Sequence, residues 1–454
     1  MNILVVGDGK VGHTVAEYLA KENHDVTIVD RSDDALKRSE DTLDVLCIRG
    51  NGANASTLMS AGADKADIII AATAGDEVNM LCCLMAKRLG AKYAIARIRD
   101  PEYNESLTLL RRELGIDLAV NPERATALEI SRLLRFPFAS NIETFAKGRV
   151  EMVEFRAQEG DKVVGIPLFD IAHRLRGIPQ VLYAAVERGG KVIIPNGQFA
   201  IQPGDRVHVA ADMVTITDYF RYLGKNSLRI KNVMLLGGGR ISFYLAKMIV
   251  SMGIRVTLIE INEKKAYALS EALPDVNVIC GDGTDQELLD QEGLSQMDAF
   301  VALCDRDEEN LMTGLLAVRK GVPKVIVKNN RGGYDEIIDA MGLDSIVSPK
   351  LITCDSILRY VRAHDNASGT KVERLYRLVG DKAEALEFIA REGDSYIGVP
   401  LKNLNIRRGT LVAVIVRNRQ VIVPFGGDHI EVGDSVIIIV CESGVTDLNE
   451  VIRL

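Results

Sequence analysis

Three glycines near the start of the chain, Gly7, Gly9 and Gly12, have a spacing that suits the binding of a diphosphate. In the pattern G-x-G-x-x-G the first glycine permits a tight turn, and the second lets backbone approach a pyrophosphate. The third lets a following helix pack closely on the preceding strand, and the start of that helix offers N–H groups and a positive dipole end to the phosphates. The loop Gly7-Asp8-Gly9-Lys10-Val11-Gly12 is therefore a candidate phosphate cradle.

An acidic residue follows this loop at the distance expected for a partner of a ribose. Asp30 closes the apolar run Val26–Val29, and its carboxylate can accept hydrogen bonds from a ribose diol. The same acid repels a 2′-phosphate, which disfavours NADP. We therefore expect a dinucleotide or related nucleotide to bind here.

The same pattern returns later in the chain. Gly237-Gly238-Gly239-Arg240-Ile241 repeats the loop, and Glu260 repeats the acid, each about 230 residues after its counterpart. Ser242 stands where the third glycine is expected, and this difference leaves the ligand of the second site open. Further matches keep an offset near 230 residues, so we interpret the chain as a tandem duplication. Their pairs are Gly50-Asn51-Gly52 with Gly281-Asp282-Gly283, Asp76–Asn79 with Asp307–Asn310, Gly165–Leu168 with Gly398–Leu401, and Ile201–Val207 with Ile430–Val436.

The elements that must position these residues are alternating strands and helices, which predict a doubly wound parallel sheet, the Rossmann-like pattern. The expected strands of the first half are Asn2–Val6, Asp25–Val29, Val45–Ile48, Ile68–Ala72 and Tyr93–Arg97. The expected helices are Val11–Glu22, Ser32–Glu40, Ser56–Ala61 and Glu77–Leu89. Residues 150–215 and 373–442 are instead short β-rich runs, which predict a small α+β module after each parallel sheet. A helix near Thr126–Leu134, with a counterpart near Cys354–Arg362, links the parts.

Other polar residues follow the expected strands, at the edge where ligands bind in open α/β sheets. They are Asn51, Thr73, Ala74, Arg97 and Arg99 in the first half, and Asp282, Cys304, Asp305 and Lys328 in the second. A cation at the end of the fifth strand would neutralise phosphate. Asp76, Glu77 and Asn79 start a helix, and we interpret them partly as N-terminal caps and as charges that complement the helix dipole.

Net charge, apolar runs and the spacing of cysteine and histidine argue against several classes of protein. The 454 residues carry a net charge of −8, which argues against a nucleic-acid surface. No apolar run approaches the roughly 20 residues of a membrane span, and no secretory signal is visible, so we expect a cytoplasmic protein. The seven cysteines and six histidines fall without ligand-like spacing, so we expect no metal site and no redox role.

The sequence GDGKVG, Asp30, GNGAN, AATAGDEVNM and IARIRDPEY resembles an RCK domain, the regulator of K⁺ conductance. The segments GIPL and IQPGDRV resemble the RCK C-terminal domain, and two such pairs in tandem resemble the TrkA family, the regulatory subunits of Trk-type potassium uptake. This resemblance implies binding of NAD(H) and, in some members, ATP or ADP. It also implies a homotetramer forming an eight-unit ring, at the inner face of the membrane, under a potassium-translocating subunit of the TrkH, TrkG or KtrB type.

The resemblance carries site residues over by position. In the first half it implies the loop 7–12, Asp30, Asn51, Thr73, Ala74 and Arg97; in the second it implies the loop 237–241, Glu260, Asp282 and Lys328. Lys328 stands where the first half has Arg97, and this difference also leaves the ligand of the second site open.

We expect RCK N-terminal domains at 1–125 and 231–350, and a linker helix with an RCK C-terminal domain at 126–225 and 351–454. The polar join Leu223–Ser227 separates the halves. The function predicted is a non-enzymatic gating subunit. Two alternatives remain: an NAD-dependent oxidoreductase, which would need an acid/base constellation beside the nicotinamide, and a nucleotide-responsive scaffold without a transporter.

Overall fold

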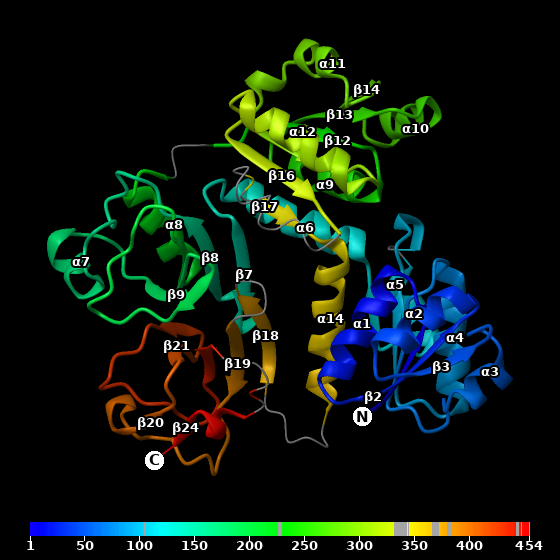
Figure 1. Cartoon of the computed structure of the whole chain (residues 1–454), viewed down its shortest axis with the longest axis horizontal. Helices are drawn as coiled ribbons and strands as arrows, with labels where there is room; N and C mark the ends of the chain where they lie inside the picture. The colour runs from blue at the N-terminus through cyan, green and yellow to red at the C-terminus, as the bar shows by residue number, and fades with distance from the viewer. Residues whose placement is uncertain are drawn as a thin grey trace. The chain divides into compact units, whose positions relative to one another are not determined.

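The computed structural model describes residues 1–103, 106–225, 229–330, 343, 345–365, 372–378, 383–441, 445 and 447–453. Asn226 and Ser227 of the expected join lie outside the described residues. The chain forms two compact units that do not follow the two sequence halves. One unit contains residues 1–127 with 348–368, and the other contains 128–347 with 369–454 (Figure 1).

The first unit is built around a six-stranded parallel sheet with the order β3-β2-β1-β4-β5-β6. Its strands are β1 (Asn2–Val6), β2 (Asp25–Asp30), β3 (Leu46–Arg49), β4 (Ile68–Ala71), β5 (Tyr93–Arg97) and β6 (Leu118–Val120). Its helices are α1 (Lys10–Lys21), α2 (Asp33–Thr42), α3 (Ala55–Ser60), α4 (Asp76–Leu89) and α5 (Leu107–Leu114), and α6 (Pro122–Arg135) follows. The strand order reverses between β1 and β4, and a ligand crevice lies at such a switch point.

The second unit contains a sheet of the same order, β14-β13-β12-β15-β16-β17. Its strands are β12 (Asn232–Leu236), β13 (Arg255–Glu260), β14 (Asn277–Cys280), β15 (Ala299–Ala302), β16 (Lys324–Lys328) and β17 (Ser345–Val347). The helices between them are α9 (Arg240–Val250), α10 (Glu263–Ala272), α11 (Gln286–Gln291) and α12 (Asp307–Arg319). The duplication inferred from the sequence is therefore a duplication of structure.

Both faces of the first parallel sheet are covered, which explains why its central strands are apolar throughout. One face packs on α3 and α4, with Leu58, Cys82 and Cys83 in its core. The other face packs on α1, whose Val15 and Leu19 are fully buried.

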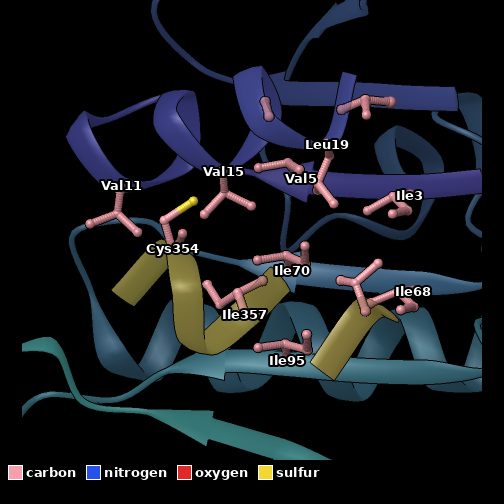
Figure 2. Close-up of a cluster of buried hydrophobic side chains, with 14 of the residues drawn as sticks. Ile3, Val5, Val11, Val15, Leu19, Ile68, Ile70, Ile95, Cys354 and Ile357 are labelled. Carbon is pink, nitrogen blue, oxygen red and sulfur yellow. The ribbon is translucent and has the colours of Figure 1, made fainter. Parts of the chain in front are cut away.

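Helix α14 (Pro349–His364), from the second half of the sequence, completes this second face. Its residues Cys354, Ile357, Leu358 and Val361 pack among the side chains of α1 and the sheet (Figure 2). An ion pair between Arg362 and Glu22 adds a polar contact at the end of the helix. The core of the first Rossmann-like domain therefore includes a helix from the second half of the sequence.

Each half also contains an antiparallel module in the second unit. The first has the strand order β10-β9-β11-β8-β7, and the second has β18-β19-β23-β21-β22 with a separate β20-β24 pair. The first module comprises β7 (Asn141–Phe145), β8 (Val150–Arg156), α7 (Leu168–Arg174), β9 (Leu182–Arg188), β10 (Lys191–Ile193), β11 (Arg206–Ala211) and α8 (Met213–Tyr222). The second comprises β18 (Val372–Leu378), β19 (Ala383–Ile389), β20 (Asn405–Ile406), β21 (Thr410–Arg417), β22 (Gln420–Ile422), β23 (Ser435–Val440) and β24 (Ile452–Arg453). Side chains from both modules, such as Met152 and Ile439, share one apolar core.

The predicted fold class is confirmed, and most predicted elements of the first half start and end within two residues of the observed ones. The short strands β6 and β17 were not predicted. Each has three residues, and so brief an apolar run lacks a measurable period. The two linker helices are longer than expected, because α6 begins at Pro122 and α14 at Pro349, and proline suits the first turn of a helix.

The glycines of the first loop should differ in their effect on stability. A Cβ added to Gly12 would lie 1.8 Å from the Gly7 carbonyl oxygen, whereas one added to Gly9 meets nothing within 4 Å. Gly12→Ala should therefore lower the free energy of unfolding by about 1–3 kcal/mol. Gly9→Ala, the matched control with an ordinary φ of −79°, should change it by less than about 1 kcal/mol. Denaturant unfolding of both variants tests this, and equal losses would contradict it.

Candidate nucleotide-binding sites

The first loop makes a turn that glycine alone can follow easily. Gly7 has a φ of +101°, and its N–H donates to the Val29 carbonyl at 2.8 Å. A Cβ there would lie 2.8 Å from the backbone nitrogen of Thr73, so the turn lies directly against the end of β4. The turn at Gly7 therefore has room for backbone but not for a side chain beside the end of β4.

The start of α1 is electrostatically available to an anion. Its N-cap residue is Gly9, no side chain caps it, and its first turn contains no acid. The neighbouring helices differ, because Ser32 caps α2, Asn54 caps α3, and α4 begins with Asp76 and Glu77. Of these four helices, α1 alone presents its amide groups and positive dipole end with neither form of compensation, as a phosphate site requires.

The Asp30 carboxylate is hydrogen-bonded to the glycine turn. One carboxylate oxygen accepts the Asp8 N–H at 2.6 Å, and the other accepts the Ser32 N–H at 2.8 Å. The carboxylate is therefore held at the carboxyl end of β2, beside the phosphate cradle, where a ribose diol can reach it.

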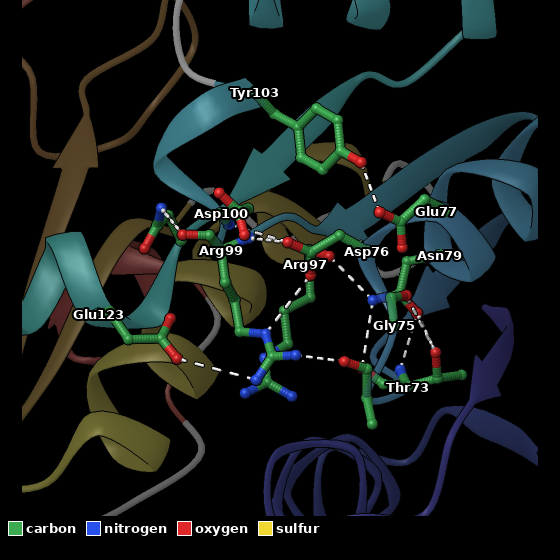
Figure 3. Close-up of polar contacts among 12 residues, drawn as sticks. Thr73, Gly75, Asp76, Glu77, Asn79, Arg97, Arg99, Asp100, Tyr103 and Glu123 are labelled. Atoms are coloured by element: carbon green, nitrogen blue, oxygen red, sulfur yellow. Dashed lines mark hydrogen bonds and ion pairs between the residues drawn. The ribbon is translucent and has the colours of Figure 1, made fainter. Parts of the chain in front are cut away.

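The polar residues that start α4 connect the ends of β4 and β5 (Figure 3). The Asn79 amide accepts the Thr73 N–H at 2.8 Å and donates to the Arg97 carbonyl at 2.9 Å. Asp76 is buried, and its carboxylate accepts the N–H groups of Arg99 and Asp100, each at 2.8 Å. The capping part of the interpretation is wrong for these two side chains, because they bond the neighbouring strand ends and not the helix amides. The dipole part agrees with the structure, since Asp76 and Glu77 lie in the first turn of α4.

The remaining predicted residues of the first site lie around the same edge. Thr73 and Ala74 follow β4, and Arg97 ends β5. The Arg99 guanidinium is used locally, since it contacts the Asp76 carboxylate and the Ala74 carbonyl. Asn51 accepts the Ala53 N–H at 3.2 Å and so shapes the turn after β3.

The second half repeats this geometry with altered side chains. Gly237 has a φ of +91°, Gly239 is the uncapped N-cap of α9, and the first turn of α9, with Arg240 and Ile241, contains no acid. Glu260 accepts the Gly238 N–H at 2.8 Å and the Asn262 N–H at 2.9 Å. Burial raises the pKa of Glu260, but the bonds from Asn262, Lys265 and Gly238 outweigh it and leave the pKa below its usual value.

Three other features distinguish the second site. Ser242 replaces the third glycine and donates its hydroxyl to the Gly237 carbonyl. Lys328 is buried, and its amine lies 3.4 Å from the Leu303 carbonyl and 3.9 Å from the Asp305 carboxylate. Asp282 accepts the Thr284 N–H at 2.9 Å and so shapes its own turn.

Comparison with known families assigns all four domains. The TrkA-N domain matches residues 3–122 and 233–349, and the TrkA-C domain matches residues 152–224 and 385–453. The chain belongs to the TrkA family. Among its relatives is a Trk system potassium uptake protein TrkA homolog of Methanosarcina mazei, 33% identical over 99% of both chains. Another is the Trk system potassium uptake protein TrkA of Vibrio alginolyticus, 34% identical over 96% of this chain and 95% of the relative.

Solved structures support the fold. The GsuK RCK domain matches with a TM-score of 0.62 at 18% identity, over 96% of this chain and 92% of that one. The GsuK channel bound to NAD matches with a TM-score of 0.63 at 18% identity, over 96% of this chain and 76% of that one.

A buried polar network beneath the first TrkA-N glycine turn escaped the sequence analysis. The Asp8 carboxylate accepts the Ser39 hydroxyl at 2.7 Å and lies 3.3 Å from His13 Nδ1, which is itself 2.8 Å from Ser39 Oγ. In the second TrkA-N domain the corresponding residues are Gly238, Phe243 and Leu269. The residues beneath the glycine turn are therefore polar in the first half and mostly apolar in the second. In the sequence, this difference is visible only when the two halves are aligned with each other.

This network is not a nucleophilic triad. In a triad, serine donates to one histidine nitrogen while the acid holds the other. Here Ser39 donates to Asp8, and His13 presents the same Nδ1 to both partners. The arrangement connects α1, α2 and the glycine turn, which is a positioning role.

Metal and membrane features are absent from the part of the chain that the structure describes. No group of three or more His, Cys, Asp or Glu side chains there could hold a metal ion. No helix there is long and apolar enough to span a bilayer. Burial raises the pKa of the Cys47 thiol and of the Cys304 thiol to about 11, so both are protonated at neutral pH.

Asp8→Asn should change how stability depends on pH. Burial raises the pKa of Asp8, and the bonds from Ser39 and His13 only partly oppose this. Between its unfolded and folded pKa values the native chain binds more protons, so this carboxyl lowers stability as the pH rises through that window. Asparagine does not titrate, so we expect the melting temperature of the variant relative to wild type to increase from about pH 3.5 to 6. The exposed neighbour Asp34→Asn is the control, and a pH-independent difference for Asp8→Asn would contradict this account.

Proposed function

We propose that this chain is the nucleotide-binding regulatory subunit of a Trk-type or Ktr-type potassium uptake system. The observation that carries the proposal is the repeated cradle, a helix start without cap or acid beside a glycine turn and a carboxylate, in both TrkA-N domains. A potassium uptake role is supported by the names of its full-length relatives.

The ligand proposed for the first site is NAD(H), with ATP or ADP as the other candidates. The residues assigned to it are the loop 7–12, Asp30, Asn51, Thr73, Ala74 and Arg97. Asp30 suits a ribose diol, and the α1 amides suit a diphosphate, features that dinucleotides and adenine nucleotides share. Solved structures of GsuK, which has a similar fold, are bound to NAD in one case and to ADP in another, and this supports both candidates.

The second site is proposed to bind through the loop 237–241, Glu260, Asp282 and Lys328, with weaker affinity. Lys265 lies 3.1 Å from Glu260, so the ribose carboxylate already has a cationic partner. Ala35 stands at the corresponding position of the first half. A ribose hydroxyl must compete with this ion pair in the second site.

The regulatory step is proposed to be a population shift. A ligand biases a conformational equilibrium only to the extent that it binds one state more tightly. Because α1 packs on α14, a ligand at the start of α1 bears on a helix that belongs, in sequence, to the second half. A differential affinity of about 10–100-fold corresponds to roughly 1–3 kcal/mol of coupling.

The assembly proposed is a homotetramer that forms an eight-domain ring against a membrane-embedded potassium-translocating subunit. We propose no enzymatic reaction, because the partly exposed His13 and the buried Ser39 hold the glycine turn and do not form a triad. We propose that this partner holds the chain at the inner face of the cell membrane.

Asp30→Ala should weaken nucleotide binding to the first site about 10–100-fold while the chain stays folded. The loss reflects charge-assisted hydrogen bonds to the ribose, each contributing about 1.5–3 kcal/mol. Glu260→Ala should produce a smaller loss, confined to the second site. Calorimetry with NAD⁺, NADH, ATP and ADP measures both.

The control is Asp41→Ala, which removes an exposed acid of α2 and should bind nucleotide as wild type does. Unchanged affinity in Asp30→Ala would refute the assignment of the ribose partner. Asp30→Ala should also alter potassium uptake in cells that depend on this chain, and unaltered uptake despite lost binding would refute the regulatory role.

A further inference from the structure

A pocket lies away from the two candidate nucleotide sites. It has a volume of about 400 Å³ and lies between the first antiparallel module and the second parallel-sheet domain, which belong to one compact unit. Lys324 and Ser345, the first residues of β16 and β17, line it. Because these are the amino ends of parallel strands, the pocket is at the opposite edge of the sheet from the glycine turn and Glu260.

The described wall of this pocket is cationic. Arg156 and Lys225 contribute from the first antiparallel module, and Lys324 contributes from the second parallel-sheet domain. The described lining residues include no aspartate or glutamate. The Asp161 carboxylate, which pairs with Lys225, offsets one of these three charges, and the remaining excess of cations gives the pocket a positive potential.

Contacts hold two of these cations in place. Lys324 is 5% exposed, and its amine donates to the Ala139 carbonyl at 2.5 Å and to the Ser345 hydroxyl at 2.7 Å. The Lys225 amine lies 2.9 Å from the Asp161 carboxylate, with 13% of its side chain exposed. These contacts order the side chains in advance, so an incoming anion loses little entropy in arranging them.

The geometry points to a binding site for a small phosphate-bearing anion in this pocket, separate from both nucleotide cradles. The planar guanidinium of Arg156 matches two phosphate oxygens at once, and each ammonium adds a point charge. A volume of about 400 Å³ is near the lower end for ligand pockets and suits orthophosphate, pyrophosphate or a small phosphorylated compound. Phe138 and Pro323 in the wall offer apolar surface to an organic substituent.

An anion bound here would join two modules. Arg156 and Lys225 are on one side of the pocket and Lys324 on the other, and the hydrogen bond from Lys324 to the Ala139 carbonyl already crosses the same junction. Bound phosphate would therefore stiffen the connection between the first antiparallel module and the second parallel-sheet domain. This inference does not depend on the proposed nucleotide function.

The test is calorimetric titration of the full chain with inorganic pyrophosphate, in wild type and in the variants Arg156→Gln and Lys225→Gln. Each variant should weaken one binding event at least tenfold. Lys191→Gln, an exposed lysine of the same module outside the pocket, should leave it unchanged. Orthophosphate and ADP titrations of the same proteins show whether an organic substituent adds affinity.

Wild-type crystals soaked in tungstate locate the site independently of how the variants fold. We expect an anomalous peak within hydrogen-bond distance of Lys324 and Lys225. Pyrophosphate binding that is insensitive to both variants, or tungstate only at the glycine turns, would overturn this inference and leave the nucleotide proposal intact. Pyrophosphate binding that depends on Arg156 and Lys225, in a chain that binds no nucleotide, would instead overturn the nucleotide proposal alone.

Discussion

A hydrogen bond between a strand-end carboxylate and a backbone N–H of the glycine turn organises each cradle. Asp30 accepts from Asp8 at 2.6 Å, and Glu260 accepts from Gly238 at 2.8 Å. The bond fixes the acid beside the helix start, so the groups that we propose as partners of a ribose and a diphosphate are held together in advance. The close packing of Gly12 against the Gly7 carbonyl constrains the same turn on the side of α1.

The duplication kept this geometry and changed its surroundings. Asp8, His13 and Ser39 form a polar floor in the first half, whereas Gly238, Phe243 and Leu269 replace them in the second. The second site also differs from the first because its acid, Glu260, is already paired with Lys265. The two cradles therefore differ in charge and in hydrogen bonding within a single chain.

Sequence reasoning recovered the features that have a local pattern. The strands of the first half, the glycine turn and Asp30 all follow from spacing and apolar periodicity. It could not find contacts between residues far apart in sequence, such as α14 on α1, since Cys354 and Val15 are separated by more than 300 positions. It also misjudged Asp76, because an acid at a helix start has the same sequence signature whether it caps the helix or bonds a neighbouring strand end.

The packing of α14 against α1 gives the cradle a mechanical connection to the rest of the chain, because the helix that would bind phosphate is the one that α14 supports. The most direct test of the central claim is a crystal structure of the full chain grown with NAD⁺. We predict a pyrophosphate at the amide groups that begin α1 and a ribose diol on the Asp30 carboxylate. A well-ordered structure in which both glycine crevices are vacant, or filled by the chain's own side chains, would contradict it.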